Sequence, residues 1–252
     1  MIIKKSAEEI ATMRRAGKVV ADTLDRLEEA VRPGVTTAEL DRIAEETIAG
    51  AGAVASFKGY RGFPGSICSS PNDMIVHGIP SAEVVLEDGD IVTLDVGAIV
   101  DGYHGDSAWT FPVGSLDPGA AELLKVTEAS LDAAIAETLP GRRLGDVGYA
   151  AQQVAEAAGF SVVREYAGHG IGRSLHEEPW VPNYGPPGRR ELLSPGMTIA
   201  IEPMVNAGGA GTRVLDDGWG VVTADGSLSA HFEHTVAITE GGHEVLTRRG
   251  PA

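Results

Sequence analysis

The chain is 252 residues long, and 43% of its residues are hydrophobic and 22% charged, as in an ordinary soluble globular enzyme. Its formal net charge of −16 argues against stable nucleic-acid binding, because a nucleic-acid interface needs a basic face. No apolar run has the length of a signal peptide or of a membrane span, and the single cysteine excludes an internal disulfide, so we expect a cytoplasmic protein without a membrane partner.

Four segments carry helix-start and helix-stop signals. Three of them begin with a Ser, Thr or Asp of the kind that caps helices, and apolar residues in the first recur at a helical period. Gly or Pro-Gly follows each segment and ends it. The predicted helices cover about 6–32, 36–51, 117–139 and 144–158.

Strand-like segments alternate with the helix pairs. Asp101-Gly102 joins the apolar runs 90–99 and 102–111 and is a hairpin signal. A further strand is predicted over 197–206 and a second hairpin over 218–239. Helix pairs alternating with antiparallel hairpins favour an α+β fold. Because no linker interrupts the pattern, we expect one domain over the whole chain.

A faint internal repeat divides the chain. The first copy has a His-x-x-Pro motif at His77, a Leu-x-x-Gly turn and then Asp95, and the second copy repeats this order from His176 to Glu202. Each copy also follows two predicted helices. The repeat predicts two pseudo-symmetric halves with metals between them, at roughly 1–115 and 116–252.

Four carboxylates and one histidine lie in short strand-like segments and look like the ligands of two metal ions. Acids are disfavoured in strands, and a buried acid needs a partner or a cation. An oxygen-rich set with one imidazole suits Mn, Fe(II), Co or Zn pairs better than a structural zinc site. Such a pair activates water, which predicts a hydrolase. The five residues are Asp95, Asp106, His169, Glu202 and Glu233.

The spacing of these residues supports the prediction. Across a two-residue turn Asp95 pairs with Ala108 and Asp106 with Gly97, so the two carboxylates share one face, roughly 7–8 Å apart at the backbone. His169 lies between glycines, which allow close backbone approach to a ligand. The glycines do not form the dinucleotide-binding pattern G-x-G-x-x-G.

The other histidines divide into two groups. Near a two-metal centre, His77 and His176 could each donate a hydrogen bond to an oxyanion or pass a proton to a leaving amine. We interpret the remaining four, His104, His231, His234 and His243, as structural or exposed.

Taken together, these motifs resemble the type I methionine aminopeptidases of bacteria. They occur in the family's order over essentially the whole chain, and they are specific jointly rather than singly. The resemblance implies the pita-bread fold, in which two α+β halves surround a dinuclear metal centre. The motifs are 76–80, 94–97 with Asp106, 168–172, 176–179, 201–204 and 232–235.

The resemblance implies a role for each proposed ligand. Asp95 would chelate one ion, Asp106 and Glu233 would bridge both, and His169 and Glu202 would complete the other. A hydroxide held by the ions would attack the carbonyl of the first residue, and Glu202 would accept its proton. The substrate would be the N-terminal methionine of nascent proteins, with its free amine bound to a metal.

The resemblance also implies substrate-facing residues. His77 would assist the scissile amide and the leaving amine, and His176 would hold the carbonyl oxygen. Leu175 departs from the family pattern, which commonly has an aromatic side chain there, so the shape of the pocket stays open. The implied methionine pocket consists of Tyr60, Phe63, Cys68 and Trp219.

Three alternatives compete with this interpretation. Xaa-Pro aminopeptidases and prolidases share the ligand set, but they usually carry a large N-terminal domain and an Arg where this chain has Ser107-Ala108-Trp109. A non-catalytic relative that binds peptides, RNA or ribosomes would typically have lost ligands. A two-carboxylate glycosidase would leave His169 unexplained. We further expect a monomer that contacts the ribosome at most transiently; the sequence leaves the native metal open.

Overall fold

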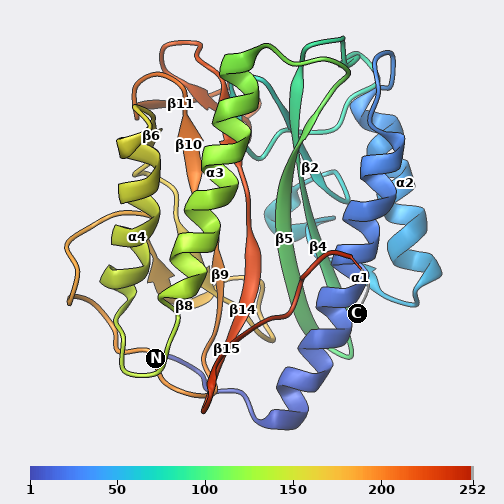
Figure 1. Cartoon of the computed structure of the whole chain (residues 1–252). Coiled ribbons are helices and arrows are strands. Elements are labelled where there is room, and N and C mark those ends of the chain that lie inside the picture. The colour runs from blue at the N-terminus through green and yellow to red at the C-terminus, as the bar shows by residue number, and fades with distance from the viewer. Residues whose placement is uncertain (251–252) are drawn as a thin grey trace.

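A computed structural model describes residues 1–250, and all four predicted helices are confirmed to within a few residues. They are α1 (Ala7–Ala30), α2 (Thr37–Gly50), α3 (Pro118–Ala136) and α4 (Leu144–Ala157). In Figure 1, α1 and α2 lie at one side of the molecule and α3 and α4 at the other, with strands running between the two pairs.

Side-chain caps fix the starts of three helices. Ser6 accepts a hydrogen bond from the Glu9 backbone at 3.2 Å, and the Glu9 carboxylate accepts one from the Ser6 backbone at 2.8 Å, which completes the predicted capping box. Thr36 and Asp117 also accept hydrogen bonds from backbone N–H groups of the first turns that follow them. Local sequence therefore determines where these helices begin.

The first predicted hairpin is confirmed. It consists of β4 (Ile91–Val100) and β5 (Tyr103–Pro112). Both turn residues have positive φ angles, 49° and 78°, as a type I′ turn requires. The register has the expected pairing for Asp95 and Asp106, so their side chains share one face of the sheet.

The remaining strands are β1 (Val54–Ala55), β2 (Cys68–Pro71), β3 (Met74–Val76), β6 (Ser161–Val162), β7 (Gly168–Gly170), β8 (Glu177–Val181), β9 (Thr198–Ile201), β10 (Met204–Asn206), β11 (Thr212–Val214), β12 (Val221–Thr223), β13 (Ser229–His231), β14 (His234–Thr239) and β15 (Gly242–Val245). The strands of residues 1–250 form four sheets, and every pairing between them is antiparallel. In the first sheet, β4 pairs with β1, β2 and β5, and the largest sheet has the order β15-β14-β9-β7-β8. The two three-stranded sheets have the orders β13-β10-β6 and β11-β12-β3.

Two strand predictions are wrong. The expected strand 197–206 breaks into β9 and β10, which lie in different sheets, because Pro203 has no N–H group for a continuous ladder. The expected hairpin over 218–239 does not form, since β12 pairs with β11 and β3 whereas β13 pairs with β10. In the predicted turn, the carboxylate of Asp225 instead accepts a hydrogen bond from Gly209 of another loop.

Each helix pair covers its own apolar core. One core packs α1 and α2 against β4, and the other packs α3 and α4 against β9 and β14. A smaller cluster, which includes Phe63, Cys68 and Leu175, draws residues from both parts of the chain. The structure is thus α+β with two helix-and-sheet halves. A boundary between residues 115 and 116 stays a prediction, and residues 251–252 lie outside the described part.

Candidate metal centre

All five predicted ligands line one cavity of about 160 Å³. Asp95 and Asp106 come from the hairpin of β4 and β5, and His169 is the central residue of β7. Glu202 and Glu233 lie at the breaks between β9 and β10 and between β13 and β14. The predicted strand 197–206 and the second strand of the predicted hairpin 218–239 thus each break at a glutamate that lines the cavity.

The side chains lie close enough to share a cation. Ligand atoms of Asp106, His169 and Glu233 all lie within 4.8 Å of one another. His169 Nε2 is 3.9 Å from Asp106 Oδ2 and 3.7 Å from Glu202 Oε1. Its other nitrogen, Nδ1, lies 2.8 Å from the carbonyl oxygen of Gly170. A proton on Nδ1 makes that hydrogen bond and leaves Nε2 free to bind a metal.

Burial makes this cluster costly without a cation. Desolvation raises the pKa of Asp95 to about 7, and burial together with the neighbouring carboxylates raises the pKa values of Asp106, Glu202 and Glu233 well above the usual range. Within residues 1–250, buried oxygens of Asp95, Asp106 and Glu233 have no hydrogen-bond partner. Burial lowers the pKa of His169 to about 3, so its imidazole is neutral and able to bind a metal. This donor set fits divalent cations.

The pKa of Asp95 predicts how pH affects the metal-free protein. An acid with a raised pKa holds a proton in the folded state that the unfolded chain releases, so the contribution of Asp95 to stability is lost as pH rises through 7. The buried histidines have lowered pKa values and act in the opposite direction, because near pH 6.5 they are partly protonated in the unfolded chain and neutral in the folded state. Comparison with Asp95→Asn at each pH isolates the contribution of Asp95, since both proteins carry the same histidines.

We expect the contribution of Asp95 to the stability of the metal-free protein to fall by about 1 kcal/mol between pH 6.5 and 8.5, which corresponds to about 2–4 °C in Tm. Thermal denaturation of the unsubstituted protein and of Asp95→Asn, both with a chelator, measures this effect as a change with pH in the difference between their Tm values. The stabilisation of the unsubstituted protein by Mn²⁺ should grow over the same range. A Tm difference that does not move against the unsubstituted protein as pH rises would contradict the prediction.

His77 and His176, for which a substrate-facing role is predicted, also line the cavity. The ring centroids of His176 and His169 are 4.1 Å apart, and His176 Nδ1 lies 3.0 Å from the hydroxyl of Tyr60. The ring of His77 meets that of Trp219 edge-on at 6.4 Å. Burial lowers the pKa of His77 to about 4, and burial followed by the charge of Arg61 lowers that of His176. Both imidazoles are therefore neutral hydrogen-bond donors at neutral pH.

The four predicted pocket residues line the same cavity. Phe63 and Trp219 pack edge to face with centroids 5.1 Å apart. Cys68 is buried. Its burial and, to a smaller extent, the nearby carboxylates raise the pKa of its thiol well above the usual value, so its neutral, polarizable sulfur forms part of the cavity wall. Leu175 is also buried and lines the cavity. These side chains leave an apolar recess beside the carboxylate cluster.

Three residues near the centre escaped the sequence analysis. Phe57 and Arg61 line the cavity but belong to no recognisable motif. His231 is 1% exposed, and its Nε2 lies 3.7 Å from Glu202 Oε2, while neither ring nitrogen has a hydrogen-bond partner in the described chain. The interpretation of His231 as structural or exposed missed its position beside a ligand. Its place beside Glu202 follows from the pairing of β13 with β10, in which His231 is opposite Met204, and no pattern in the sequence predicts that pairing.

Comparison with known proteins agrees with this geometry. Residues 11–240 match the model of metallopeptidase family M24. The chain belongs to metallopeptidase family M24. Among similar proteins, methionine aminopeptidase 1 of Bacillus subtilis is 54% identical over 98% of this chain and 100% of its own length. Methionine aminopeptidase of Escherichia coli is 48% identical over 97% of this chain and 93% of its own length.

Solved structures extend the comparison to the fold of this M24 chain. Methionine aminopeptidase from Rickettsia prowazekii superposes with a TM-score of 0.97 at 42% identity, over 98% of this chain and 100% of that chain. Prolidase from Pyrococcus furiosus reaches a TM-score of 0.79 at 23% identity, over 99% of this chain and 66% of that chain, which shows a common fold alone. The pita-bread fold expected from the sequence is confirmed.

Proposed function

We propose that this M24 chain is a methionine aminopeptidase, a hydrolase that removes the N-terminal methionine from proteins and peptides. The observation that carries the proposal is one cavity in which four carboxylates and His169 adjoin an apolar recess. Full-length similarity to relatives of that name supports it. Release of free methionine from the peptide Met-Ala-Ser tests it.

The proposal includes two divalent cations, Mn, Co, Fe(II) or Zn, held by Asp95, Asp106, His169, Glu202 and Glu233. The unpartnered buried oxygens of three of these ligands support it. When bound, the cations would lower the pKa of water enough for it to act as a nucleophile at neutral pH and would polarise the substrate carbonyl. Metal content of the purified protein, with and without chelation, measures the number of ions.

The chain's own groups then have distinct tasks. Glu202 would take a proton from the attacking water, because its carboxylate lies inside the cavity beside His169. The neutral imidazole of His176 would donate a hydrogen bond to the carbonyl oxygen as negative charge develops there. His77 would donate a hydrogen bond to the scissile amide and assist departure of the amine. The recess formed by Tyr60, Phe63, Cys68 and Trp219 would hold the methionine side chain.

Trp219→Ala is expected to lower kcat/KM for Met-Ala-Ser by about 10- to 100-fold, because loss of one wall removes apolar contact with the methionine side chain. The matched control is Trp180→Ala, since Trp180 is 42% exposed and does not line the cavity. Peptide kinetics together with metal content measure both variants. If the two substitutions lowered kcat/KM equally, Trp219 would not be part of the methionine pocket.

We further propose that the protein works in the cytoplasm as a monomer and contacts ribosomes only transiently. The acidic net charge of −16 disfavours a stable complex with RNA. Among residues 1–250, no helix combines the length and apolar character needed to cross a membrane. Sedimentation of the protein alone tests whether it is a monomer. Sedimentation of its mixture with ribosomes, at low and physiological salt, tests whether the contact with ribosomes is transient.

A further inference from the structure

We propose that residues 3–9 position the loop that carries His176, chiefly through a buried ion pair between Lys5 and Glu177. The inference rests on the proposed function, because His176 is the proposed donor to the substrate carbonyl. Lys5 and Glu177 are thus positioning residues, which act on the reaction through His176. In Figure 1 the segment before α1 crosses from the side of α3 and α4 to the side of α1 and α2.

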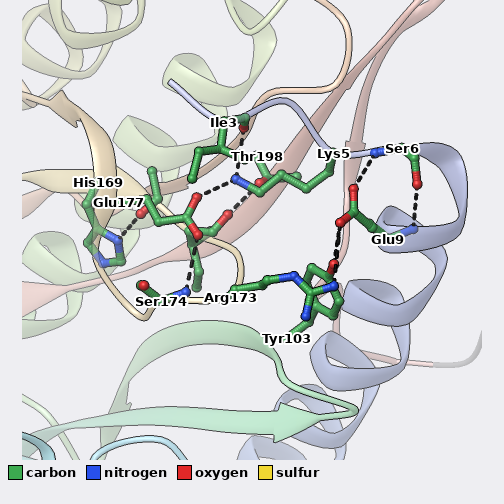
Figure 2. A network of polar contacts seen from close by, with 12 residues as sticks. Ile3, Lys5, Ser6, Glu9, Tyr103, His169, Arg173, Ser174, Glu177 and Thr198 are labelled. Carbon is green, nitrogen blue, oxygen red and sulfur yellow. Dashed lines mark hydrogen bonds and ion pairs between the residues drawn. The ribbon is translucent and has the colours of Figure 1, made fainter. Parts of the chain in front are cut away.

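The ion pair is short and almost completely buried. Lys5 Nζ lies 2.6 Å from Glu177 Oε2, and the two side chains are 3% and 6% exposed. The same ammonium group donates a hydrogen bond to the carbonyl oxygen of Ile3 at 3.1 Å (Figure 2). The backbone N–H of Lys5 donates to the carbonyl oxygen of Gly196 at 2.7 Å. The segment is therefore fixed by contacts of both the backbone and the side chain of Lys5.

Glu177 connects the segment before α1 to the loop between β7 and β8. It directly follows His176, and its second oxygen, Oε1, accepts a hydrogen bond from the backbone of Ser174 at 3.2 Å. The loop packs tightly against the pair at Gly172, where an added Cβ would lie 2.4 Å from Lys5 Cε and 2.7 Å from Glu177 Oε1. The carboxylate thus holds residues on both sides of His176.

A second contact holds the same loop from its exposed side. The guanidinium of Arg173 lies 4.4 Å from the centre of the Tyr103 ring and 3.8 Å from Glu9 Oε1, and the Tyr103 hydroxyl donates to that carboxylate (Figure 2). Arg173 is mostly exposed, so its ion pair is a weak anchor. The buried pair of Lys5 and Glu177 is the stronger one.

The location of the pair suggests what it is for. A buried ion pair is a poor source of stability, because desolvation of both charges offsets their attraction. A donor to a developing oxyanion, in contrast, must be placed to within a fraction of an ångström, and small displacements cost large factors in rate. The ring of His176 already lies against that of His169, so movement of its loop would withdraw it from the proposed carbonyl site.

A double-mutant cycle tests the inference. In the full-length, metal-loaded protein, Lys5→Met should lower kcat for Met-Ala-Ser by about 10- to 100-fold, with KM and metal content nearly unchanged. In the His176→Ala background, the same substitution should have almost no further effect, because the group it positions is absent. Lys18→Met is the matched control, since Lys18 forms an exposed ion pair with Asp22 on α1.

Imidazole nitrogen NMR of the metal-free protein supplies a readout that does not depend on activity. The His176 signals, assigned with His176→Ala, should shift or broaden in Lys5→Met and remain in place in Lys18→Met. If Lys5→Met does not fold, Lys5→Met with Glu177→Leu replaces it, because removal of both charges leaves no uncompensated ion.

Two results would overturn the inference. One is an equal loss of kcat from Lys5→Met in both backgrounds, which would give the pair a general structural role. The other is an unchanged kcat with unchanged His176 signals. Methionine release by the unsubstituted protein tests the proposed function separately. A failure of the proposed function can therefore be distinguished from a failure of the positioning role of Lys5 and Glu177.

Discussion

Asp106→Asn is expected to reduce metal-dependent methionine release by roughly 10³-fold or more, since a bound Lewis acid supplies several kcal/mol of transition-state stabilisation. Asp106 is 4% exposed, and its carboxylate lies among those of Asp95 and Glu233. The fold should persist, because the amide keeps the side-chain volume and the backbone N–H and carbonyl groups of Asp106 stay hydrogen-bonded to Thr235. Peptide kinetics, metal content and circular dichroism measure these effects.

The hairpin that carries Asp106 also offers a matched control. Asp101 lies in the exposed turn with a φ of 49°, a conformation that asparagine tolerates. Asp101→Asn should therefore retain activity and metal content. Full activity in Asp106→Asn would contradict the five-ligand site.

His176→Ala is expected to lower kcat by about 10²–10³-fold, as the loss of one oxyanion donor does. Metal content should not change, because the proposed ligands stay in place. The matched control is His243→Ala on β15, which does not line the cavity. Steady-state kinetics and metal analysis separate the roles. If metal content falls with the rate, His176 is a ligand and its proposed role is wrong.

The features predicted correctly from the sequence depend on local patterns. The helix starts follow from Ser6, Thr36 and Asp117, and the register of the first hairpin follows from a two-residue turn. That register alone places Asp95 and Asp106 on one face. The acids in the other apolar segments and the glycine-flanked His169 complete the predicted ligand set, and the structure brings all five residues to one cavity.

The features that were missed depend on contacts between distant segments. Whether 218–239 forms a hairpin is decided by β3 and β10, which compete for its strands. Lys5 and Glu177 are 172 positions apart, and no periodicity links them. The position of the unpartnered His231 imidazole beside Glu202 likewise depends on where the fold places β13.

Release of amino acids from Met-Ala-Ser and Ala-Pro-Ser by metal-stripped protein, with and without added Mn²⁺ or Co²⁺, is the most direct test of the proposed function. We expect free methionine from the first peptide only when metal is present, and no cleavage of the second. Cleavage of Ala-Pro-Ser instead would assign the chain to the proline-specific members of the fold. Metal binding without cleavage of either peptide would contradict the proposed activity.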